Sequence, residues 1–143
     1  MAGQDIFDLE RFVLAQDEIL ARVMEELQAG AKRSHWMWFI FPQFIGLGQS
    51  AMSRRYAIRS VGEASAYLDH ALLGPRYREA VAALLRHETL SAHAIFGSPD
   101  DLKLHSSLTL FTRVAPDETL LEEALARFFE GKHDSSTVRL IGH

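Results

Sequence analysis

The ten residues from Ser34 to Gln43 hold both tryptophans of the chain and two of its nine phenylalanines. A run this apolar must be buried in the core or line a pocket, because large exposed aromatic surfaces are unfavourable in water. It is too short to cross a membrane, which takes about 20 apolar residues. It also carries His35, Gln43 and two indole N–H groups, which need hydrogen-bond partners once buried. We therefore expect the rest of the chain to enclose this run.

Length and composition limit the class of protein. A chain of 143 residues predicts one domain, a single helical domain over residues 1-143. The net charge of −4 makes nucleic acid an improbable partner, since nucleic-acid-binding domains are normally basic. Without cysteine the chain has no disulfide and no thiolate, and its seven histidines form no metal-binding pair. We predict no metal site and no cofactor.

The N-terminal segment does not resemble a signal peptide. Acidic residues stand where a signal peptide has basic ones, and no apolar segment follows. No stretch of the chain has the length and hydropathy of a transmembrane helix. We therefore expect a cytoplasmic protein that does not enter the membrane.

Helical periodicity dominates the chain outside the aromatic run. Apolar residues recur at helical spacing from about 8 to 29, and Gly30 is placed to end that helix. Ser60 followed by Glu63 matches a capping box, which predicts a helix start. Three further starts are predicted at Gly74-Pro75, at Ser98-Pro99 with Ser98 as the cap, and at Pro116-Asp117.

Residues 35–41 show no alternation of apolar and polar side chains. No second strand-like run is present to pair with them, and an unpaired buried strand would leave backbone groups without partners. We therefore expect a short helical or irregular segment here. The prediction for the chain is an all-α fold, a single compact domain of six or seven helices packed around the aromatic-rich segment.

Further motifs accompany the aromatic run over most of the chain: Asp8–Val13, Ala15-Gln16, Gly46–Gly48, Tyr56–Ile58, Glu63–Leu68, Phe96-Gly97, Lys103-Leu104 and Thr109–Phe111. On these residues and Ser34–Gln43 the chain resembles the bacterial domain-of-unknown-function family 1810 (DUF1810), whose members are sometimes mislabelled calpastatin. His105 departs from the family pattern, which has arginine there. The resemblance implies a small, mostly helical, cytosolic domain and implies no particular reaction.

His35 and Asp100 are the candidate catalytic residues. A histidine can act as acid or base near neutral pH, but His35 can equally fix the loop after Gly30 through a backbone hydrogen bond. Asp100 can act as a carboxylate base. It can also pair with Lys103, three residues later on the same helix face, and Lys103 can otherwise clamp an anion.

Trp36, Trp38 and Gln43 are candidate ligand-binding residues. The indoles can stack on a ligand ring or belong to the core. They are two residues apart and point to different sides of a short helix, so at most one has to face a ligand. The side-chain amide of Gln43 can form hydrogen bonds with the edge of a purine base, or it can cap a helix.

Two basic clusters flank the aromatic run, Lys32-Arg33 before it and Arg54-Arg55 after it, with Gly46 and Gly48 between. Arginine, free backbone amides and an aromatic plane together suit a phosphate-bearing ligand. The alternative is an ordinary solvated surface. We hypothesise an anionic small molecule, nucleotide-like or otherwise phosphate-bearing, with Arg54, Arg55 and Lys103 as further ligand-binding residues.

Two other functions remain open from the sequence. The aromatic run can anchor a partner protein, which predicts a flat exposed aromatic patch. It can also be purely structural, which predicts full burial of both tryptophans with no adjoining cavity. The small-molecule hypothesis predicts instead that several of the candidate residues line one concavity.

Overall fold

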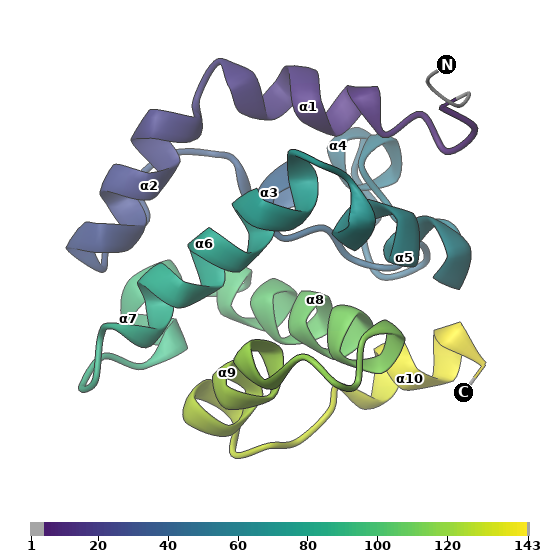
Figure 1. Ribbon diagram of the computed structural model, residues 1–143. Coiled ribbons are helices and arrows are strands. Elements are labelled where there is room, and N and C mark those ends of the chain that lie inside the picture. The colour runs from purple at the N-terminus through teal and green to yellow at the C-terminus, as the bar shows by residue number, and fades with distance from the viewer. Residues whose placement is uncertain (1–4, 143) are drawn as a thin grey trace.

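The computed structural model describes residues 5–142, which form ten helices and, within that range, no strand (Figure 1). Seven of the helices have seven or more residues, so the all-α prediction is confirmed. None of the helices in these residues is both long and apolar enough to cross a membrane. The helices are α1 (Glu10–Asp17), α2 (Leu20–Ala29), α3 (Met37–Ile40), α4 (Ala51–Arg55), α5 (Val61–Asp69), α6 (Leu73–Leu85), α7 (Ala92–Phe96), α8 (Asp100–Val114), α9 (Thr119–Phe129) and α10 (Ser135–Ile141).

Two helices, α6 and α8, organise the packing. Helix α6 contacts α2, α5 and α9, and α8 contacts α5, α7, α9 and α10. In Figure 1 the N-terminal helices α1 and α2 lie along one side of the molecule, while α9 and α10 lie beyond α8 on the other. Helix α8 is buried along most of its length, including the hydroxyl residues Ser106, Ser107 and Thr109. The short helix α3 lies between these layers and contacts α1.

The prediction of one continuous helix over residues 8–29 is wrong. Helix α1 ends at Asp17, and Ile19 leaves helical geometry with φ −125° and ψ 2°. Side chains at the end of α1 bond to other elements: the Gln16 amide donates to the Phe39 carbonyl at 2.7 Å, and Asp17 pairs with Arg76 at 2.8 Å. These contacts orient α1 towards α3, while α2 turns to pack on α6.

Aromatic rings from distant segments meet in the centre of the fold. Phe41 lies 5.6 Å from Tyr77, which lies 4.6 Å from Phe111, measured between ring centroids. Trp36 packs edge-on against Phe96 at 6.3 Å. The predicted short helical segment is confirmed as α3. Most apolar side chains of the run Ser34–Gln43 pack in this central core. Burial of such rings supplies much of the driving force for folding.

Local signals set some helix starts but not all. Ser60 caps α5 as predicted, since its side chain accepts from the Glu63 N–H at 3.0 Å. The predicted cap by Ser98 is wrong: α8 begins at Asp100 after Pro99, without a side-chain cap. The Asp101 N–H instead donates to the carbonyl of Gly97 at 2.9 Å, so a backbone group takes the role expected of the serine.

Candidate functional site

The carboxylate of Glu26, in the last turn of α2, fixes the start of the aromatic run. It accepts hydrogen bonds from the backbone N–H groups of Arg33 at 2.8 Å and Ser34 at 3.1 Å. The Ser34 hydroxyl donates to its second oxygen at 2.5 Å, and the Trp36 indole N–H donates at 2.9 Å. One buried acid therefore satisfies the Trp36 indole and the polar groups of Arg33 and Ser34 at the start of the run.

The ionisation of Glu26 follows from these contacts. Burial by itself raises the pKa of the carboxyl, but the hydrogen bonds from Ser34, Arg33 and Trp36 outweigh burial and lower the pKa to about 2. Glu26 is therefore a carboxylate at neutral pH and serves as a structural acceptor. The sequence contained a signal for it, because Glu26 lies between Val23 and Leu27 on the buried face of an amphipathic helix.

A cluster of three charges lies beside the tryptophans. Asp100, at the start of α8, pairs with Lys32 at 2.9 Å and with Lys103 at 3.4 Å. The two ammonium groups lie near indole rings, Lys32 5.0 Å from the centroid of Trp36 and Lys103 5.5 Å from that of Trp38. Lys32 also donates to the Ser34 carbonyl at 2.5 Å. This lysine–aspartate cluster connects α8 to the aromatic run, and the pairing of Asp100 with Lys103 expected from their spacing is confirmed.

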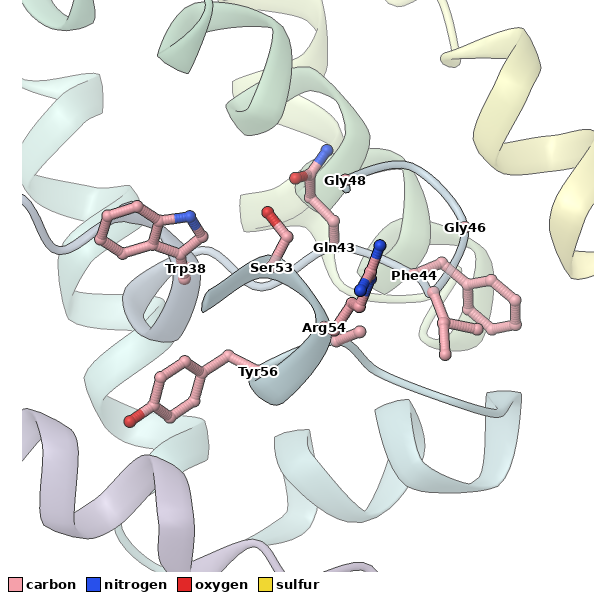
Figure 2. Close-up of a pocket in the computed structure, with 10 residues that line it drawn as sticks. Trp38, Gln43, Phe44, Gly46, Gly48, Ser53, Arg54 and Tyr56 are labelled. Atoms are coloured by element: carbon pink, nitrogen blue, oxygen red, sulfur yellow. The ribbon is translucent and has the colours of Figure 1, made fainter. Parts of the chain in front are cut away.

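Beside the aromatic run lies a pocket with about 20 Å³ of space for water-sized molecules, which we call the motif pocket. Figure 2 shows Gln43 and Ser53 between the indole of Trp38 on one side and the loop through Gly46 and Gly48 on the other. The pocket is narrow and in this conformation has room for water rather than for a ring. Its lining residues are Trp38, Gln43, Phe44, Ile45, Gly46, Gly48, Ser53, Arg54, Tyr56 and Ala57.

Backbone contacts shape the motif pocket. Ile58 joins the segment after Pro42 in an isolated parallel bridge: its N–H donates to the Gln43 carbonyl, and its carbonyl accepts from the Ile45 N–H, each at 2.9 Å. Between these paired segments the chain loops out. A side chain at Gly48 would collide with Ser53, so glycine is needed for the loop to pass close to α4.

A second concavity adjoins the motif pocket and is rich in arginine. This arginine groove is open to solvent, has about 340 Å³ of space for water-sized molecules, and is lined by Asp8, Arg11, Ala51, Arg54, Arg55 and Arg59. Arg54, Arg55 and Arg59 are exposed, and none of them forms an ion pair within residues 5–142. Arg54 lines both concavities, so the groove and the motif pocket adjoin at this side chain.

The guanidinium of Arg11 is already saturated. It donates to the carbonyls of Arg55 at 2.7 Å and Ala57 at 2.8 Å, to two carbonyls of its own helix start, and to the Glu63 carboxylate at 2.8 Å. Both side chains of this ion pair are nearly inaccessible. Arg11 therefore positions the backbone that presents the exposed arginines of the groove, rather than offering a free cation itself.

The structure brings some of the predicted site residues together and separates others. Trp38, Gln43 and Arg54 line the motif pocket, and Arg55 lines the arginine groove. Trp36 has no exposed surface, and Lys103 and Asp100 belong to the lysine–aspartate cluster, which reaches the pocket only through Trp38. His35 is exposed and lines neither concavity.

The lining residues that sequence reasoning missed include Ser53, Tyr56 and Arg59. Ser53 and Tyr56 flank the predicted Arg54-Arg55 pair, so proximity in sequence was a usable signal for both. Arg59 gave no local signal, because only the path of the chain between α4 and α5 brings it beside the other arginines.

Comparison with known proteins gives a family and a close structural relative. Residues 6–141 match a family described as "Protein of unknown function (DUF1810)". The crystal structure of the conserved hypothetical protein Rv1873 from Mycobacterium tuberculosis, at 1.38 Å, is 49% identical in sequence with a TM-score of 0.95. The alignment covers 97% of this chain and 99% of that one. The search of curated proteins gave no significant match.

Proposed function

The chain belongs to the DUF1810 family, and we propose that it binds a nucleotide-like or other phosphate-bearing small molecule across the motif pocket and the arginine groove. One observation carries the proposal: Arg54 lines both concavities. An aromatic pocket and an unpaired cationic groove that meet at one side chain suit a ligand with a ring at one end and an anion at the other.

The motif pocket supplies the groups that a ring requires. Trp38 offers aromatic surface, and the Gln43 amide offers both a donor and an acceptor to the edge of a base. Because the pocket is narrow, a ring enters only if a lining side chain moves. Arg54 is exposed and can rotate outward without loss of an ion pair, so we propose that it opens the pocket.

The arginine groove supplies the anion-binding groups. A guanidinium can grip a phosphate through two parallel hydrogen bonds, which a lysine ammonium cannot reproduce. Arg54, Arg55 and Arg59 have their positive charge uncompensated by a nearby carboxylate, apart from Asp8 at the rim. Three such cations on one concavity of a protein with a net charge of −4 suit a small anion better than an extended polyanion.

We propose binding and assign no turnover to this site. Of the two candidate acid–base residues, Asp100 is neutralised by two lysines, and His35 lines neither concavity. The alternative of a partner-binding aromatic patch has less support, because Trp36, Phe39 and Phe41 are buried and Trp38 is half-buried. The alternative of a purely structural run predicts that no ligand binds.

Calorimetry against a panel of nucleosides, nucleoside mono- and diphosphates, dinucleotides and sugar phosphates tests the proposal. We expect a phosphorylated member to bind at least about tenfold more tightly than its unphosphorylated counterpart. Arg54→Lys and Arg59→Lys are expected to weaken that binding by about tenfold, and Trp38→Leu to weaken binding of ring-bearing members alone. Arg22→Lys, at an exposed arginine of α2 outside both concavities, is the matched control.

Two results would overturn the proposal. If the natural sequence binds no member of the panel while its fold is intact, the structural alternative becomes the better explanation of the aromatic run. If a ligand binds but the arginine variants and the Arg22→Lys control behave alike, the anion lies elsewhere on the molecule.

A further inference from the structure

A third concavity lies on the other side of the molecule from α1 and has no residue in common with the motif pocket or the arginine groove. We call it the α8–α9 groove. It is open to solvent, has about 540 Å³ of space for water-sized molecules, and is larger than either of the others. Its lining residues are Thr112, Arg113, Pro116, Glu122, Leu125, Ala126, Gly131 and His133.

Thr112, which lines this groove, has a hydroxyl without a hydrogen-bond partner in the described part of the chain. Thr112 is 5% exposed, and its Oγ1 is the buried side-chain polar atom that has no hydrogen-bond partner within residues 5–142. Its neighbours on α8 are satisfied: the Ser106 hydroxyl donates to the Leu102 carbonyl at 3.2 Å, and Thr109 accepts from the Asp134 N–H at 2.9 Å. A buried hydroxyl without a partner is unfavourable, so turning the Thr112 side chain towards a group bound in the groove would relieve it.

The walls of the groove carry opposite charges that do not neutralise each other. Arg113 extends from the last turn of α8, and Glu122 lies in the first turn of α9. Both are exposed, and no ion pair joins them or engages either with another residue of the described chain. A ligand with one positive and one negative group would satisfy both walls at once.

The remaining lining residues limit the size and polarity of such a ligand. Leu125 is buried at the base of the groove, and Ala126 and Pro116 add apolar surface beside it. Burial together with the charges of Arg113 and His105 lowers the pKa of His133, so its imidazole is neutral near pH 7 and can donate or accept one hydrogen bond. The groove thus combines two charges, a hydroxyl and an apolar base.

We propose that the α8–α9 groove binds a small zwitterion of the amino-acid class with an aliphatic side chain. The ligand carboxylate bonds to the guanidinium of Arg113 and, with the Thr112 side chain rotated towards the groove, accepts from its hydroxyl. The ligand ammonium pairs with the carboxylate of Glu122, and the aliphatic side chain packs on Leu125 and Ala126. This site is independent of the phosphate-bearing ligand proposed for the motif pocket.

Leucine and two matched analogues test this assignment by calorimetry. 4-Methylpentanoate lacks the ammonium group of leucine, and 3-methylbutylamine lacks its carboxylate. We expect each analogue to bind at least about tenfold more weakly than leucine. Arg113→Gln, Glu122→Gln and Thr112→Val are each expected to weaken leucine binding by about tenfold, with thermal stability of Thr112→Val undiminished because the unpaired hydroxyl is removed.

The control is Glu123→Gln, which removes the neighbouring charge on α9 from outside the groove. Leucine binding unchanged in this variant and in Arg54→Lys supports the proposed site. The proposal is overturned if no aliphatic amino acid binds the folded protein at millimolar concentration. It is equally overturned if 4-methylpentanoate binds as tightly as leucine, or if Glu123→Gln weakens binding as much as Glu122→Gln does.

Discussion

The indole N–H of Trp36 donates to the carboxylate of Glu26 across 2.9 Å, and both side chains are buried. The two residues come from different segments, one at the end of α2 and the other just before α3. The same carboxylate accepts hydrogen bonds from the backbone N–H groups of Arg33 and Ser34. A single acid therefore holds the segment between α2 and α3 in place. This contact determines how the aromatic run enters the core.

Replacing Glu26 by glutamine is expected to destabilise the fold by about 2–3 kcal/mol at neutral pH, because an amide has only one acceptor oxygen for four donors. The loss should depend on pH. The pKa of Glu26 falls from its ordinary 4.5 to about 2 on folding, so between these values the unfolded state binds the proton and the folded state does not. The stabilisation is complete above about pH 5 and disappears as the pH falls towards 2.

Urea titrations of the natural sequence and of Glu26→Gln at several pH values measure this effect. The difference between their free energies of unfolding should shrink by up to about 3 kcal/mol from pH 6 to pH 2. The other carboxylates titrate in both proteins, so their contribution cancels in the difference between the two free energies of unfolding. A difference that stays constant over this range would contradict the lowered pKa.

The two tryptophans should differ in their effect on stability. Trp36 is fully buried and hydrogen-bonded, so Trp36→Ala is expected to cost about 3–5 kcal/mol. Trp38 is half-buried and lines the motif pocket, so Trp38→Ala should cost clearly less. Chemical denaturation of both variants checks this order. Losses below about 1 kcal/mol at both positions would mean that the aromatic run is a surface feature.

Two helical glycines offer a matched test of packing. A methyl group at Gly74 in α6 would collide with the backbone carbonyl of Leu68, so Gly74→Ala is expected to destabilise the fold by about 1–3 kcal/mol. At Gly62 in α5 the nearest atom to such a methyl belongs to Phe7 at 3.5 Å, an ordinary contact. Gly62→Ala should therefore be neutral or stabilising by up to about 1 kcal/mol. If the melting temperatures of the two variants shift in the same direction, this explanation of Gly74 is refuted.

Breaking the buried ion pair between Arg11 and Glu63 should lower the free energy of unfolding far more than breaking an exposed ion pair. Arg11→Met leaves the Glu63 carboxylate buried without its cation and removes the side-chain donor of four carbonyls, so a loss of about 3–5 kcal/mol is expected. Arg76→Met breaks the pair with Asp17, whose side chain is 51% exposed, and should cost about 1 kcal/mol or less. Equal losses in urea titrations of the two variants would disprove the difference.

Periodicity and capping chemistry were sufficient to predict the all-α class, the cap at Ser60 and the end of α2 at Gly30, whose φ of 73° suits glycine. These features depend on interactions within one turn or one helix, which the local sequence determines. The density of aromatic residues in Ser34–Gln43 likewise indicated burial. Spacing also predicted the Asp100–Lys103 pair, because residues three apart are neighbours on a helix.

Tertiary contacts decided the rest. The break at Ile19 depends on Gln16 bonding to Phe39, a partner 23 residues away that no local pattern reveals. The roles of Trp36 and Trp38 differ because Glu26 binds one indole in the core while the other borders a pocket. The meeting of Arg54 with Arg59, and the unpaired hydroxyl of Thr112, also arise only from packing. Sequence specifies which groups are present and where helices form, but the partner of a buried polar group depends on distant segments brought together by burial of the core.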